Sequence, residues 1–126
     1  METTRSFVQV PLSDEALAGG LATLTEEEVP WWPVAILALE PSEIEQKYHI
    51  EFYDSFDNLD YLKVAVLDLC SGVRVALKRH RGTPGPGTDI SVSANRIHDY
   101  EPVVSEVVDA LGLHPDDVLW SRPQDD

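Results

Sequence analysis

The stretch "KVAVLDLCSGVRVALKRHRG", residues 63–82, decides the fold of this chain. Two runs rich in valine and leucine, 63–70 and 73–81, flank the dipeptide Ser71-Gly72. Because glycine supplies the positive φ that tight turns require, the pattern predicts an antiparallel β-hairpin. A two-residue turn would place one set of side chains on a shared, core-facing surface. That set is Val64, Val66, Cys70, Val73, Val75 and Leu77.

Four further segments have the patterns of strands that could extend this hairpin into a sheet. "TDISV" at 88–92 predicts a strand, and "VAILALE" at 34–40 is a continuous apolar run typical of a strand buried on both faces. Residues 48–52 alternate apolar and polar side chains, which indicates a half-buried strand. "SFVQVPL" at 6–12 fits a short edge strand, since Pro11 cannot donate a hydrogen bond to a ladder.

The clearest helix lies near the C-terminus, at residues 101–111. Its apolar stripe comprises Val103, Val104, Val107, Val108 and Leu111, Asp99 is placed to cap its start, and Gly112-Leu113 suits a Schellman ending. Shorter helices are predicted for 13–24 and 42–46, and a helical turn for 114–120 that packs Leu119 and Trp120 back on the core. The acidic stretch 54–60 is expected to be a loop or a single helical turn.

Taken together, these elements predict an α+β protein, mainly an antiparallel β-sheet with the C-terminal helix packed on one face. The chain has 126 residues, which fits one domain over 1–126, with 1–5 and 122–126 frayed. The chain contains a single cysteine, and neither a signal peptide nor a membrane-spanning segment is recognisable. We therefore expect a cytoplasmic protein.

Acidic residues are in large excess, and they are unevenly distributed. The formal net charge is −14; residues 1–62 hold 13 acids against 2 bases, and residues 63–126 hold 10 against 7. Such a field repels nucleic-acid phosphates and anionic lipid, and attracts basic proteins. The sequence therefore predicts a basic protein partner, no nucleic acid and no membrane, unless the acidity serves only to keep the chain soluble.

The stretch "VPWWPVAIL", residues 29–37, places two tryptophans between two prolines. Eight of these residues, 30–37, resemble the signature of the PWWP domain, a small β-barrel chromatin reader, and the resemblance implies an aromatic cage for methylated lysine. PWWP domains have a Gly-Asp-hydrophobic-Trp-Ala-Lys strand before the signature and a basic surface, whereas this chain has "TLTEEEV" and an acidic first half. The chain is therefore not assigned to that family. The tryptophans are expected either to anchor this segment on the core or to form a binding hot spot.

The function expected first is that of a small acidic protein-binding module: an inhibitor, an immunity-type antidote or an assembly subunit. Charge and aromatic character select the residues that would meet a basic partner. These residues are Trp31, Trp32, Glu26, Glu27, Glu28, Asp54, Asp57 and Asp60.

The alternative is a small enzyme or anion-ligand binder with a pocket near the basic strand 74–81 and the "GTPGPG" loop 82–87. Arg79, His80 and Arg81 would bind the anion, and His80 or Asp89 would act as acid or base. The loop is not a P-loop, because Thr88-Asp89 stands where lysine and serine or threonine are needed. No catalytic signature, metal-ligand spacing or cofactor motif is found, so neither a metal nor a cofactor is expected.

Overall fold

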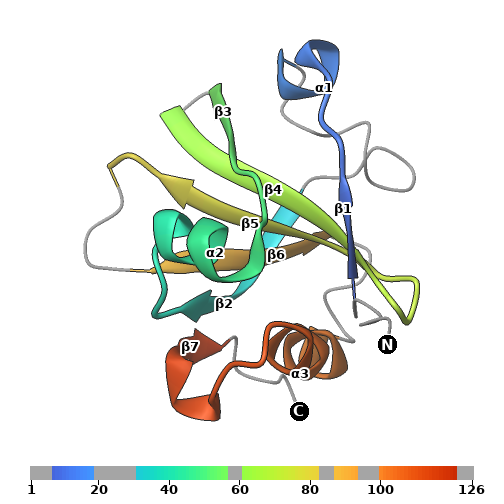
Figure 1. Ribbon diagram of the computed structural model, residues 1–126, viewed down its shortest axis with the longest axis vertical. Coiled ribbons are helices and arrows are strands. Elements are labelled where there is room, and N and C mark those ends of the chain that lie inside the picture. The colour runs from blue at the N-terminus through green and yellow to red at the C-terminus, as the bar shows by residue number, and fades with distance from the viewer. Residues whose placement is uncertain (1–6, 19–30, 57–60, 83–86, 94–99, 122–126) are drawn as a thin grey trace.

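The computed structural model of the chain describes residues 7–18, 31–56, 61–82, 87–93 and 100–121 (Figure 1). Within these ranges seven strands form one antiparallel sheet in the order β1-β4-β5-β6-β2-β7, with β3 pairing the same edge of β4 as β1. The strands are β1 Phe7–Val10, β2 Trp31–Leu37, β3 Tyr53–Phe56, β4 Tyr61–Leu69, β5 Arg74–His80, β6 Thr88–Ser93 and β7 Val118–Ser121. The helices are α1 Asp14–Ala18, α2 Pro41–Tyr48 and α3 Tyr100–Ala110, followed by the 3₁₀ turn Pro115–Asp117. The predicted α+β class is confirmed.

The hairpin β4–β5 forms as predicted, but its turn has three residues instead of two. Leu69 N donates to Val73 O at 2.9 Å and Gly72 N donates to Leu69 O at 2.9 Å, with Gly72 at φ +91°. This is a type I turn followed by a glycine in the left-handed region. Because the register moves by one residue, the predicted common face is divided between the two sides of the sheet. Cys70, expected in the core, is exposed at the turn.

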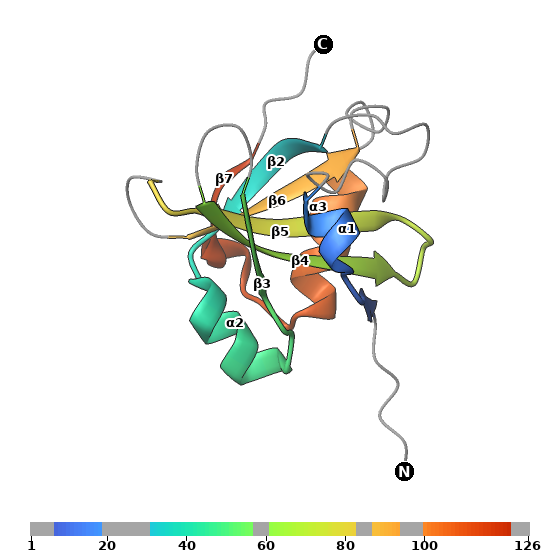
Figure 2. The same ribbon diagram turned by 90° about the horizontal axis from the view of Figure 1, so that it is seen from above.

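Both sides of the hairpin are nevertheless buried, in two separate apolar clusters. The larger core receives Ala65, Leu67, Leu69, Val75 and Leu77 from the hairpin, together with side chains of β2, α2 and α3. The smaller core receives Leu62, Val64, Val66 and Ala76, together with Leu12 and the partly buried Leu17 of α1. Figures 1 and 2 show α1 and α3 on opposite sides of the sheet, so each core has its own helical cover.

Helix α3 confirms the predicted C-terminal helix and its packing on one face. Val103, Val107 and Leu111 are buried in the larger core. The helix ends in a Schellman motif, in which Gly112 (φ +61°) donates to Asp109 O and Leu113 donates to Val108 O. The predicted cap Asp99 lies outside the described residues. Glu106 fixes the helix to the hairpin turn by accepting hydrogen bonds from Ser71 N at 3.1 Å and Ser71 Oγ at 2.5 Å.

Two sequence expectations about strands are corrected. The stretch 48–52 is not a strand, because α2 continues to Tyr48 and His49 ends it in the left-handed region. The Gln9 side chain then bonds both backbone groups of Glu51, so this segment has its hydrogen bonds without a sheet partner. The strand β3 begins at Tyr53 instead, so Asp54 lies in a strand and not in a loop.

The segment after α3 also differs from the helical turn predicted for residues 114–120. Pro115 starts a 3₁₀ turn, as expected, but the next residues form β7, which pairs with β2. The side chains of Leu119 and Trp120 are therefore 53% and 41% exposed, and they do not pack back on the core.

Candidate functional site

A pocket of about 680 Å³ lies between the start of α2 and the adjoining ends of β3, β4 and β5. Its floor is the sheet, with Asp54, Lys63 and Arg79 side by side across three strands. Its other wall is the start of α2, with Glu40 at the N-cap and Glu45 within the helix. The volume is in the range of pockets that bind small molecules.

The floor of the pocket brings like charges together. Lys63 and Arg79 are directly opposite each other in the β4–β5 register, an arrangement that destabilises a sheet unless it is neutralised. Lys63 Nζ lies 2.9 Å from Asp54 Oδ1, and this hydrogen bond raises the pKa of Lys63. Arg79 Nε lies 3.0 Å from Glu40 Oε2. The four residues thus form a row in which each cation has a carboxylate on its outer side.

Arg79 and Glu40 are also tied to the backbone of Gly87. Arg79 Nη1 donates to Gly87 O at 2.6 Å, and Gly87 N donates to Glu40 Oε1 at 3.3 Å. The next residue, Thr88, is buried and donates from Oγ1 to Leu39 O at 2.6 Å. These contacts join the start of β6 to the junction of β2 and α2, so Arg79 has a structural role in the wall of the pocket.

The pocket gathers the three residues expected from the sequence to bind an anion: Arg79, His80 and Arg81 all line it. Asp89, expected as an acid or base, is not among its lining residues. Asp89 faces Lys78 across the β5–β6 pair. Burial raises the pKa of Asp89, against the opposing effects of His80, Arg79 and Lys78.

The two adjacent tryptophans do not form one surface. Successive side chains of a strand point to opposite faces of the sheet. Trp31 packs against the smaller core, with Lys78 Nζ 5.7 Å from its ring centroid. Trp32, in contrast, is paired with Val92, a residue of the larger core, and is 41% exposed. A flat partner therefore meets one indole or the other.

The remaining expected partner-binding residues are divided between two situations. Asp54 is exposed in β3 and paired with Lys63. Glu26, Glu27, Glu28, Asp57 and Asp60 lie outside the described residues.

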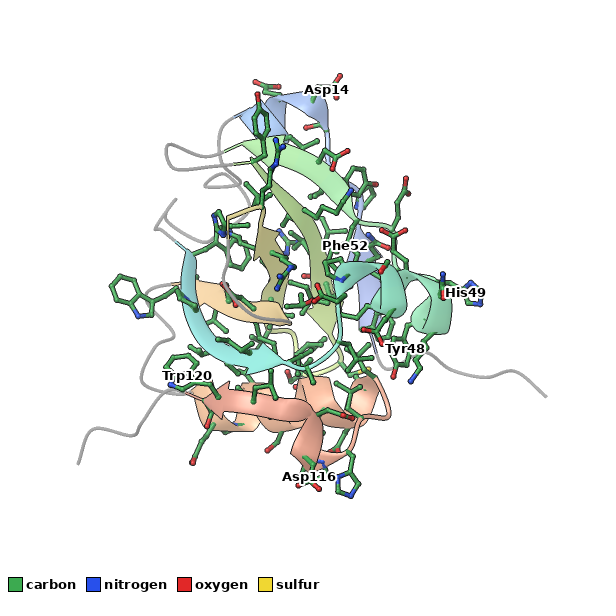
Figure 3. All side chains as sticks on the ribbon, turned by 90° about the vertical axis from the view of Figure 1, so that its left-hand side faces the viewer. Asp14, Tyr48, His49, Phe52, Asp116 and Trp120 are labelled. Carbon is green, nitrogen blue, oxygen red and sulfur yellow. The ribbon has the colours of Figure 1, made fainter. Side chains whose placement is uncertain are left out.

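A surface that the sequence reasoning missed is formed by residues 100–121, which we call the C-terminal layer. It holds five carboxylates and no lysine or arginine, and the next base in the sequence is Arg122. The carboxylates belong to Glu101, Glu106, Asp109, Asp116 and Asp117. Figure 3 shows Asp116 and Trp120 within this layer. The sequence does show that residues 100–121 contain no lysine or arginine. The net charge of the whole second half, 63–126, does not reveal this, because its seven bases lie outside that run.

The bases of the described residues are concentrated elsewhere. All six lie in α2, β4 and β5 or directly after β5. Lys63 and Arg79 form the ion pairs given above, and Arg74 Nε lies 2.7 Å from Asp68 Oδ1. The acidic excess is therefore not neutralised by bases of the C-terminal layer itself.

Other classes of site have no support in the described residues. No three His, Cys, Asp or Glu side chains within these ranges come together as metal ligands would. Among the helices that the structure describes, none is both long and apolar enough to cross a bilayer. Comparison with family models, with curated proteins and with solved structures gives no match, so no function is carried over from a relative.

Proposed function

We propose that this chain is a protein-binding module that docks on a basic surface of a partner through its C-terminal layer. The observation that carries the proposal is the separation of charge: residues 100–121 hold five carboxylates and no lysine or arginine, and the same segment carries the exposed side chains of Leu119 and Trp120. Acidic groups steer a basic partner into place, and an exposed indole supplies the apolar contact that most often dominates binding energy.

The C-terminal layer is also held rigidly, which favours binding because little order has to be created. Glu106 fixes α3 to the β4–β5 turn, and the Schellman motif fixes its end. β7 is hydrogen-bonded to β2, so Trp120 is presented from a strand. Asp109 and Asp116 are exposed on this scaffold.

The proposal also covers the class of protein to which the chain belongs and its location in the cell. An inhibitor, an immunity-type antidote or an assembly subunit would each need such a surface, and a cytoplasmic location is part of the proposal. Nucleic acid and anionic membranes are not proposed as partners, because their phosphates would be repelled by a chain of net charge −14.

The pocket is not the proposed docking surface. Three carboxylates in its lining face three cations, Lys63, Arg79 and Arg81, so the pocket lacks the excess of acidic groups that would attract a basic partner. No catalytic step is proposed there either, because Asp89 does not line the pocket.

The test is affinity capture from lysate of the source organism with three immobilised forms of the chain. The first is the wild type, and the second is Asp109→Asn with Asp116→Asn. The third is Glu15→Gln with Glu51→Gln, which removes two exposed acids from outside the layer and changes the net charge equally.

We expect basic proteins that leave the wild type as salt rises, that are retained by the Glu15/Glu51 variant, and that are lost from the Asp109/Asp116 variant. Equal loss from both variants would show that only overall charge matters, and full retention by both would show that Asp109 and Asp116 take no part in binding. Retention that does not respond to salt, or retention of no protein, would contradict the proposal as well.

A further inference from the structure

The pocket between α2 and the strand ends is lined by Arg81, which takes part in neither of the two ion pairs described above. Arg81 N donates to Tyr61 O at 2.8 Å, which continues the β4–β5 register by one more pair. Since side chains two residues apart in a strand point to the same face, Arg81 lies on the same face as Arg79, and Tyr61 on the same face as Lys63. Three cations therefore share one end of the pocket floor.

Two of these cations are neutralised within the pocket and the third is not. Asp54 pairs with Lys63, and Glu40 pairs with Arg79. Within the described part of the chain, no carboxylate is hydrogen-bonded to the guanidinium of Arg81 or forms an ion pair with it. A guanidinium that is held at the end of a strand, and that forms no ion pair with a described carboxylate, is suited to bind a carboxylate or phosphate in a bidentate manner.

The surroundings of Arg81 favour an organic anion over a bare ion. Tyr61, its cross-strand neighbour, is 59% exposed and adds an aromatic side chain to the pocket lining. The pocket is larger than an inorganic anion needs, and its size suits a drug-sized organic molecule. Among the lining carboxylates, Glu45 on α2 forms no ion pair with a described residue, and its negative charge helps to raise the pKa of Lys63. A ligand's charge would therefore lie on the Arg81 side, away from Glu45.

We propose that this pocket binds a small organic anion, with its carboxylate or phosphate on Arg81 and its apolar or aromatic part beside Tyr61. The proposal is independent of docking through the C-terminal layer, because the two surfaces share no residue. The neutralised pairs Asp54–Lys63 and Arg79–Glu40 hold the walls in place.

The test uses three probes with the same ring: 3-phenylpropionate, phenyl phosphate and phenethylamine. Titration of the ¹⁵N-labelled chain, followed by amide chemical shifts, compares the wild type with Arg81→Gln and with Lys47→Gln. Lys47 is an exposed cation of α2 that does not line the pocket, so this control changes the net charge equally. Among the described residues, the hydrogen bond that holds Arg81 comes from its backbone N–H, which the substitution keeps, so the variant is expected to fold.

We expect at least one of the two anions to bind with a Kd on the order of 1 mM or below and to shift amides at 61–63 and 79–81. The relative affinity of the two anions identifies carboxylate or phosphate as the preferred group. Arg81→Gln should weaken binding about tenfold or more, and Lys47→Gln by less than about twofold. Glu45→Gln should tighten binding about two- to threefold.

Failure of both anions to bind would overturn the proposal. So would equal binding of phenethylamine, equal binding by Arg81→Gln, or weaker binding by Glu45→Gln.

Discussion

Gly87 lies so close to Leu37 that a Cβ atom on Gly87 would overlap the Leu37 carbonyl oxygen. Gly87 also has φ +122°, a conformation that L side chains rarely adopt. This close approach brings β6 beside β2 and places the Gly87 backbone between Arg79 and Glu40. The wall of the pocket therefore depends on a glycine at this position.

Gly87→Ala is expected to lower the free energy of unfolding by about 3 kcal/mol, from left-handed strain and overlap together. The control is Gly72→Ala, which has φ +91° but nothing within 4 Å of a Cβ atom, and which should cost only about 1 kcal/mol. Urea unfolding followed by fluorescence measures both. Equal losses would show that the contact with Leu37 is not a constraint.

Val107 is fully buried in the larger core, on the stripe by which α3 packs on the sheet. Val107→Asp should lower the free energy of unfolding by about 3 kcal/mol or more, because it buries an unpaired charge. Ser105→Asp, on the exposed side of the same helix, should change it by less than about 0.5 kcal/mol. Thermal unfolding compares them, and a Val107→Asp variant that melts like the wild type would show that α3 does not cover this core.

Cys70 is exposed at the β4–β5 turn, whereas a two-residue turn would bury it. We expect its thiol to react with Ellman's reagent in the native protein nearly as fast as in 6 M guanidinium at the same pH. Protection by a factor of about 100 or more would mean that the thiol is reached only through unfolding, and that the three-residue turn is wrong.

Burial raises the pKa of Asp89 above its ordinary value, so the folded state disfavours the ionised carboxylate. Stability from this group is complete below the unfolded pKa, and it is lost as pH rises through the higher folded pKa. Asp89→Asn should therefore be more stable than the wild type at pH 7 and about equally stable at pH 3.5. Urea unfolding at the two pH values checks this, and a variant less stable than the wild type at pH 7 would contradict it.

The elements of the fold with regular local patterns could be predicted from the sequence. Helix α3 was identified by its 3.6-residue stripe and its Gly112 cap, and β6 by its short β-rich run. The register of the hairpin could not be predicted, because Gly72 suits the last position of a three-residue turn as well as of a two-residue turn. This one-residue difference in register decides whether Val64 lies in the same core as Val75 or in the other core.

The structural predictions that were wrong concern segments whose conformation depends on contacts with residues distant in the sequence. β7 is a strand because β2 offers it an edge, and the pattern of residues 118–121 carries no strong signal of its own. The stretch after Tyr48 is held by Gln9, some 42 residues away. Of the candidate sites, residues 79–81 line a pocket, whereas the carboxylates of its two ion pairs, Glu40 with Arg79 and Asp54 with Lys63, come from segments distant in the sequence.

The most direct test of the proposed function is hydrogen–deuterium exchange of the chain with and without the basic protein retained in the capture experiment. Docking through the C-terminal layer predicts slower exchange on binding in peptides covering 100–121, with little change in 40–48 and 61–81. Protection centred on 40–48 or 61–81, or spread evenly over the chain, would contradict docking through the C-terminal layer.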